Sequence, residues 1–287
     1  MTLSCVQFSS AKDFLQTSEG YLLRNESFHN LILGLAGSIS VGSRQENEAV
    51  FFSILQHGKV VGAALRTDVD KPLAISLMSG EIIEILIEYL RRFEMTLSGV
   101  VGPKDACIDF SRLWTAAGAL THELYMHQGI YETRSVVVPP ADGGAMVQIS
   151  NDRRVIAREF IGGFIRECFP SSENVSEQVE VLLDRHMRHK TCYFWQNADG
   201  ELVAMAAKNR ESKNAATISL VFTPQHARGK GYASCLVASL TQKLLSEDKP
   251  MCNLYTDLKN PTSNSIYQKM GYEFVGEGLH YLFRQKN

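Results

Sequence analysis

One stretch near the C-terminal end constrains the fold more than any other. Residues 218–222 are apolar and predict a β-strand, and a turn at Thr223-Pro224 ends it. After Gly231, apolar residues recur at helical spacing as far as Leu244. The stretch therefore predicts a strand, a glycine-bearing loop and a helix in direct succession.

The glycines and basic residues of this loop indicate what it binds. Gly229 and Gly231 carry no side chain, so their backbone N–H groups can approach a ligand closely. A helix N-terminus favours an anion, and Arg228 and Lys230 add positive charge beside it. We interpret the loop as a pyrophosphate cradle, with a tight turn and a surface basic pair as the alternative. The P-loop motif and the dinucleotide fingerprint are both absent.

A second segment carries residues that mark the start and the end of a helix. Residues 252–256 predict a strand, after which Asn260 suits an N-cap, Pro261 the first helical position and Gly271 the C-terminal cap. A short helix is expected between these caps. Two further strands are predicted after it, over residues 272–275 and 279–283.

Together these segments resemble a known family. Arg228-Gly229-Lys230-Gly231-Tyr232-Ala233 resembles the Arg/Gln-x-x-Gly-x-Gly/Ala motif of the GNAT superfamily of N-acetyltransferases. The residues from Asn260 to Tyr272 resemble the second motif of the same family, in the same order. The resemblance extends over residues 190–285. It implies acetyl-CoA or another acyl-CoA as co-substrate.

The resemblance also assigns roles within the site. The strand edge would pair with the pantetheine arm, and the N–H of Val221 would polarise the acetyl carbonyl. Tyr267 would give a proton to the departing thiolate; the alternative is a packing role on its short helix. A cap alone suffices for Asn260, whereas Asn264 is expected to contact the pantetheine or phosphate end. The complete set implied to bind acyl-CoA is Leu220, Val221, Phe222, Thr223, Arg228, Gly229, Lys230, Gly231, Tyr232, Ala233, Ser234, Asn260, Asn264 and Tyr267.

The general base is not assigned by the sequence. Many GNAT members carry a glutamate on the central strand, but residues 217–221 contain no carboxylate. Glu159, Glu167 and His186 are candidates, as is a chain of water molecules. For each of these side chains an ordinary surface role is the alternative.

The two halves of the chain share a pattern. Residues 51–64 and 193–206 both predict a hairpin that turns near a glycine, and Gly58 and Gly200 lie 142 positions apart. An amphipathic helix over residues 82–93, a strand over 97–101 and a helix over 109–117 continue the parallel. We interpret this as a duplication, with a chance match of common hairpins as the alternative.

The halves differ at the loop. After Leu77 the first half has Met78-Ser79-Gly80-Glu81, which lacks the cradle motif and places a negative charge where a phosphate would go. We therefore predict two tandem GNAT-like α/β domains, each a mixed, mostly antiparallel sheet flanked by helices. Residues 1–140 form a degenerate domain and residues 145–287 the catalytic one, divided near residues 138–144. The first domain either supplies a wall of the substrate site or only covers apolar surface.

Composition sets the remaining limits. The chain is 45% hydrophobic with a net charge of -2, so it suits a globular protein and gives no case for a nucleic-acid partner. No apolar run is long enough for a membrane span, and no secretory signal is visible. Six scattered cysteines without a Cys-x-x-Cys pair favour the cytoplasm and argue against metal or disulfide use.

The functional expectation is direct transfer of an acetyl group to a primary amine of a small molecule or peptide in a ternary complex. Two alternatives stand. In the first, the donor is a longer acyl-CoA or an aminoacyl group. In the second, the protein is a non-catalytic acyl-CoA sensor or scaffold. The identity of the acceptor, and the choice between monomer and homodimer, are left open.

Overall fold

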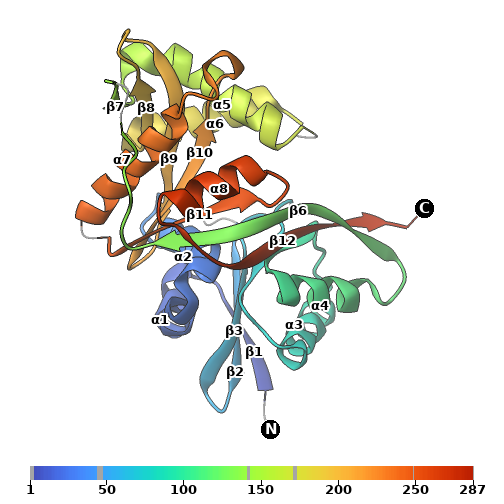
Figure 1. Ribbon diagram of the computed structural model, residues 1–287. Helices are drawn as coiled ribbons and strands as arrows, with labels where there is room; N and C mark the ends of the chain where they lie inside the picture. Colours follow the sequence, from blue (N-terminus) through green and yellow to red (C-terminus); the bar gives the residue numbers. More distant parts are fainter. Residues whose placement is uncertain (1–2, 44–47, 141–142, 171–172, 248, 287) are drawn as a thin grey trace.

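A computed structural model of the chain describes residues 3–43, 48–140, 143–170, 173–247 and 249–286. In the described residues, twelve strands form one continuous sheet with helices packed on both of its faces (Figure 1). No helix in these ranges is both long enough and apolar enough to cross a membrane.

The first half contributes six strands and four α-helices. In chain order they are β1 (Leu3–Phe8), α1 (Ala11–Leu22), the 3-10 helix η1 (Leu23–Asn25), α2 (Glu26–Ser40), β2 (Val50–Gln56), β3 (Lys59–Arg66), β4 (Leu73–Ile75), α3 (Gly80–Arg92), β5 (Gly99–Pro103), α4 (Lys104–Thr115) and β6 (Leu120–Thr133).

The second half repeats this order. Its elements are β7 (Ala145–Gln148), η2 (Asn151–Arg153), α5 (Arg154–Cys168), α6 (Val175–His189), β8 (Cys192–Gln196), β9 (Leu202–Glu211), β10 (Ala215–Phe222), η3 (Gln225–Ala227), α7 (Tyr232–Ser246), β11 (Met251–Asp257), α8 (Pro261–Lys269) and β12 (Glu273–Gln285).

The strand order shows that the two halves exchange their last strands. The order is β1-β2-β3-β4-β5-β12-β6-β11-β10-β9-β8-β7, so β12 pairs with β5 of the first half and β6 pairs with β11 of the second. In both halves the fourth and fifth strands are parallel while their neighbours are antiparallel. The tandem arrangement expected from the sequence is confirmed, and the exchange ties the halves together at the centre of the sheet.

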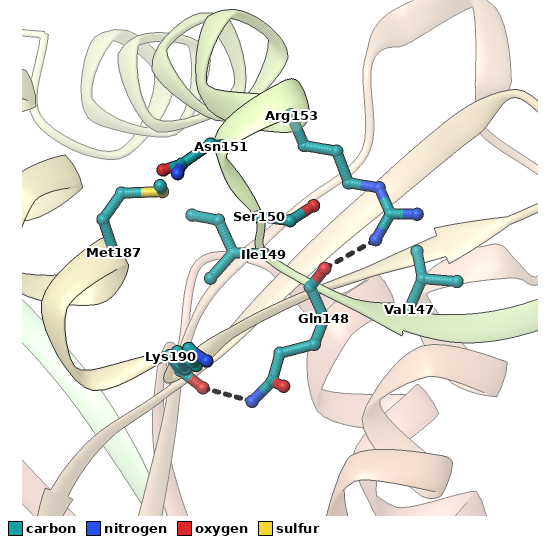
Figure 2. A pocket seen from close by; sticks show the side chains of 8 residues that line it. All are labelled: Val147, Gln148, Ile149, Ser150, Asn151, Arg153, Met187 and Lys190. Atoms are coloured by element: carbon teal, nitrogen blue, oxygen red, sulfur yellow. Dashed lines mark hydrogen bonds between the residues drawn. The ribbon is translucent and has the colours of Figure 1, made fainter.

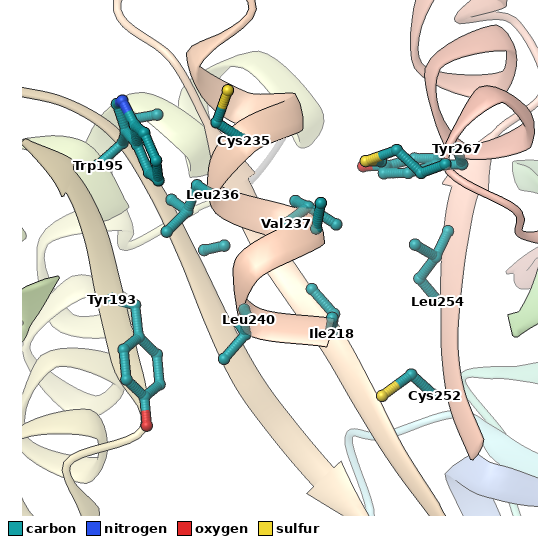
Figure 3. Packing of buried hydrophobic residues seen from close by; sticks show 14 of the residues in the cluster. Tyr193, Trp195, Ile218, Cys235, Leu236, Val237, Leu240, Cys252, Leu254 and Tyr267 are labelled. Carbon is teal, nitrogen blue, oxygen red and sulfur yellow. The ribbon is translucent and has the colours of Figure 1, made fainter. Parts of the chain in front are cut away.

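Alternation along the strands explains why helices cover both faces. In β9, Ala204 and Ala206 join a core cluster with α7 and α8, whereas Met205 and Ala207 join another with α5 and α6. Figure 3 shows the first cluster, with Leu236 of α7 on the side of Trp195. The first half behaves alike: α3 and α4 cover one face, and α1 and α2 cover the other.

Several local predictions are confirmed, and others need correction. The β2–β3 hairpin turns at His57 and Gly58, both at positive φ. Helix α4, predicted over residues 109–117, begins at Lys104, directly after Pro103. The two C-terminal strands are one strand, β12, interrupted by bulges.

Strand β6 was not predicted at all. Its residues 121–125 are exposed, so the sequence lacks the alternation that marks a half-buried strand. The predicted boundary over residues 138–144 follows β6, and residues 141 and 142 of that stretch lie outside the described residues.

Helix α2 of the first half covers part of the second half. Its Asn30 lies in a buried polar network, where the Thr217 hydroxyl donates to Asn253 at 2.7 Å and Arg210 donates to Asn30 at 3.2 Å. Gly34 allows the close approach, since a Cβ there would lie 2.8 Å from the Cβ of Arg210. This contact fixes α2 across β9 and β10.

Candidate functional site

Strands β10 and β11 of the second half are paired over only part of their length. Their parallel pairing ends at Ile218 opposite Leu254. On its other edge, β10 carries a bulge between Ser219 and Phe222, and Leu220 lies at φ +53°. A bulge and a parted strand pair leave backbone groups of β10 without a strand partner.

The loop after β10 presents further donors. Gly229 and Gly231 have φ of +78° and +79°, values that favour glycine, and each would find open space around a Cβ. The N–H of Cys235 donates to the carbonyl of Gly231 at 3.0 Å. Within the described chain, the N–H groups of residues 229–234 have no acceptor. The loop thus has the row of backbone donors at the start of α7 that the predicted cradle requires.

The basic residues of the loop have different surroundings. Arg228 donates to the carbonyl of Thr223 at 2.9 Å and forms an ion pair of 2.5 Å with Glu167 at the end of α5. Lys230 is exposed, as is His226. The cradle is therefore positive overall, with one carboxylate at its rim.

The second motif forms the short helix predicted for it. The side chain of Asn260 accepts from the N–H of Ser263 at 3.1 Å, and Pro261 opens α8, so the predicted N-cap is confirmed. Asn264 donates to the carbonyls of Asp257 and Asn260 and accepts from the Tyr131 hydroxyl at 3.1 Å. Its amide thereby joins α8 to the end of β11 and to the exchanged strand β6.

Tyr267 is buried on α8 between two other tyrosines. Its ring centroid lies 6.5 Å from that of Tyr131 and 6.0 Å from that of Tyr272. Burial raises the pKa of the Tyr267 phenol well above its usual range, and the nearby Cys168 thiol adds to the rise. The phenol is protonated at neutral pH and can act as a proton donor.

Two groups near this opening were missed by the sequence, the hydroxyl of Ser219 and the thiol of Cys168, whereas Thr223 belongs to the predicted set. The hydroxyls of Ser219 and Thr223 are buried and have no partner among the described residues. Cys168 is exposed at the end of α5, yet partial desolvation raises the pKa of its thiol to about 11, and Glu167 and Asp257 add to the rise, so this cysteine is a neutral thiol. Only the absence of apolar character at position 219 signalled the Ser219 hydroxyl.

Of the base candidates, His186 is unsuited. It is fully buried on α6, its Nδ1 lies 2.7 Å from the Thr191 hydroxyl, and burial lowers its pKa to about 3. Glu159 is exposed on α5, and Glu167 lies at the cradle rim with Arg228. The remaining predicted residues lie together: Val221 and Phe222 are half-buried on β10, and Tyr232, Ala233 and Ser234 form the first turn of α7.

A cavity of about 530 Å³ lies elsewhere, where β7 meets η2 and the end of α6 (Figure 2). Gln148 donates to the carbonyl of Lys190 at 2.6 Å, and Arg153 donates to the carbonyl of Gln148 at 2.6 Å. No residue of β10, its loop or α8 lines this cavity, so it is separate from the cradle. The described residues also contain no cluster of three metal-ligating side chains.

Comparison with known proteins agrees with this geometry. Residues 197–280, which include β10, the cradle and α8, match the model of the FR47-like protein family. A tandem GNAT protein from the clavulanic acid biosynthesis pathway superposes with a TM-score of 0.54 at 13% identity, covering 99% of this chain and 98% of its own. The fold is that of a tandem GNAT protein.

Two further structures superpose over nearly the whole chain. A Drosophila melanogaster protein has a TM-score of 0.66 at 13% identity, covering 97% of this chain and 98% of its own. A GCN5-related N-acetyltransferase from Sphaerobacter thermophilus has a TM-score of 0.57 at 13% identity, covering 98% and 95%. No curated protein sequence matches the chain. At these identities the likeness is one of fold.

Proposed function

We propose that this protein is an N-acetyltransferase that moves an acetyl group from acetyl-CoA to a primary amine of a small molecule or peptide. One observation carries the proposal: the opening between β10 and β11 leads to a loop whose six successive N–H groups, residues 229–234, have no acceptor in the described chain. Unpaired backbone donors at a helix N-terminus suit the pyrophosphate of CoA. The tandem GNAT fold supports the same reaction class.

The residues present fit acetyl-CoA. The unpartnered hydroxyls of Ser219 and Thr223 and the parted edge of β10 offer the hydrogen-bonding groups that an extended amide-bearing arm requires. Arg228 and Lys230 would neutralise phosphate charge. When bound, acetyl-CoA supplies an activated thioester for attack by the amine.

The remaining roles fall to groups of this chain. The N–H of Val221 would hold the thioester oxygen as charge develops on it, because β10 has no partner on β11 at this point. The Tyr267 phenol, protonated at neutral pH, would transfer its proton to the departing sulfur. No carboxylate lies on residues 217–221. We therefore propose that the amine loses its proton to water or to Glu167 at the rim.

The first half would act as a scaffold in this scheme. Its α2 covers β9 and β10 through the Asn30 network. We propose functional units of residues 1–140 and 145–287, with the acyl site in the second unit alone. We further propose that the protein acts in the cytoplasm without a nucleic-acid or membrane partner.

A thermal-shift titration followed by a turnover assay tests the proposal. Acetyl-CoA at 100 times its dissociation constant should stabilise the fold by about 2.7 kcal/mol. Longer acyl-CoAs, NADH and ATP are the comparison ligands. A library of primary amines should then contain one that releases CoA faster than hydrolysis alone. Binding without turnover on any amine would favour a non-catalytic acyl-CoA sensor, an alternative that the missing carboxylate on β10 supports. No binding of any CoA would overturn both.

A further inference from the structure

A groove of about 810 Å³ separates the two halves and takes no part in the proposed acyl transfer. One wall is formed by α1 and the C-terminal part of α2, and the other by α6. The end of β9 and the turn before β10 complete the lining. Because the cradle follows the other end of β10, the groove and the cradle lie at opposite ends of an eight-residue strand.

The lining of this groove is basic. It contains five lysine and arginine side chains against two glutamates, a net formal charge of +3, whereas the whole chain carries -2. Glu211 is already paired with Lys208 at 2.6 Å. Lys213 and Lys249 form no ion pair with the described residues, and Lys249 donates to the carbonyl of Ser212 at 2.8 Å. Concentrated positive charge in a concave site attracts anions.

The lysines are not required to complete the end of α2. A helix C-terminus presents unpaired carbonyls that basic side chains often satisfy. Here the carbonyls of Gly37, Ser38 and Ile39 already accept from the N–H groups of residues 41–43. Capping therefore does not explain the positive charge in the groove.

The size and the polar lining of the groove suit a small molecule. Its volume lies within the range of pockets that hold metabolites. Ser40, Ser43 and Asn209 add hydroxyl and amide groups to the lining. We propose that the groove binds a small polyanion, a molecule of metabolite size with two or more phosphate or carboxylate groups. Such a ligand would contact both halves at once.

Calorimetric titration with inorganic tripolyphosphate and with citrate tests this proposal and distinguishes phosphate from carboxylate chemistry. The Gly231→Asp protein is titrated beside the wild type, so that binding in the cradle is removed. We expect at least one probe to bind both proteins, more weakly as salt rises. Lys213→Glu with Lys249→Glu should weaken that binding at least tenfold. The milder pair of substitutions, Lys213→Gln with Lys249→Gln, replaces the glutamate pair if that variant does not fold.

Lys59→Glu with Lys71→Glu, two exposed lysines outside the groove, is the matched control with the same change in net charge. Equal losses in the control pair and the groove pair would overturn the proposal, as would the absence of binding to wild type by either probe. The groove variants should keep the full thermal shift with acetyl-CoA. That readout separates a failure of this proposal from a failure of the acyltransferase proposal.

Discussion

Both halves of the molecule contain an equivalent pair of parallel strands, β4 with β5 and β10 with β11, but they differ in the segment that follows the first strand of the pair. In the second half, β10 runs for eight residues and ends in an open glycine loop. In the first half, β4 has three residues, and α3 begins at Gly80 without a loop of that kind. The N–H of Leu77 donates to His29 Nε2 at 3.0 Å, and the carbonyl of Leu77 accepts from the Tyr21 hydroxyl.

The difference shows what a ligand site requires beyond the fold. In the first half, side chains from α1 and α2 occupy the backbone groups at the end of the strand. Gly102 also lies against Ile75, where a Cβ would come within 2.4 Å of the Ile75 carbonyl oxygen. The duplicated sheet supplies the frame, whereas unpaired backbone groups and glycine decide which half can accept a ligand.

The largest effect is expected from a substitution at the start of α7, compared with the same substitution at the start of α3, the equivalent helix of the first half. Gly231→Asp places a carboxylate in the cradle and a side chain at φ +79°, so we expect at least a hundredfold weaker acetyl-CoA binding, measured by thermal shift. Gly80→Asp, at the first position of α3, is the control and should leave that binding unchanged. Equal losses in both variants would refute a site confined to the second half.

Tyr267→Phe should have the next largest effect. It removes the proton donor but keeps the ring, so we expect kcat to fall about a hundredfold with little change in the KM for acetyl-CoA. Tyr272→Phe is the control, because its hydroxyl lies 2.7 Å from that of Thr241 in the core. That variant should lose about 1 kcal/mol of stability and keep its turnover. An unchanged kcat in Tyr267→Phe would remove this residue from the mechanism.

The sequence predicted the second half well because its signals are local. The strand, turn and helix around Gly231, and the cap at Asn260, follow from neighbouring residues. The exchange of β6 and β12 could not be predicted in this way, since it depends on pairing between distant strands. The hydrogen bonds of His29 and Tyr21 to the backbone of Leu77 could not be predicted for the same reason, because neither residue lies near Leu77 in the sequence.

Acid should destabilise both halves through histidines whose pKa is lowered by burial: His29 in the first half, and His186 and His280 in the second. Burial lowers the pKa of His29 to about 4 and that of His186 to about 3 from 6.5. Because the unfolded chain binds the proton first, stability is full above pH 6.5 and falls as the pH drops toward these values. Between pH 7.5 and 5, His29 should account for a loss of about 2 kcal/mol.

Urea unfolding of His29→Gln at both pH values measures this loss. Glutamine can still accept from the N–H of Leu77 but does not titrate, so the difference between the two pH values should shrink by about 2 kcal/mol. His226→Gln, an exposed residue, is the control and should keep the full difference. An equal difference in all three proteins would show that folding does not lower the pKa of His29.

The smallest effect is expected from the carboxylate at the cradle rim. Glu167→Gln breaks an ion pair whose side chains are 51% and 45% exposed, so its effect on stability should stay within about 1 kcal/mol. It also removes a negative charge beside the proposed phosphate site, and acetyl-CoA should bind about two- to threefold more tightly. Glu180→Gln, which breaks the Arg158 pair between α5 and α6, should leave that affinity unchanged. Should kcat of Glu167→Gln instead fall a hundredfold while that of Glu180→Gln does not, Glu167 is the general base. The rim of the cradle would then supply the carboxylate that β10 lacks.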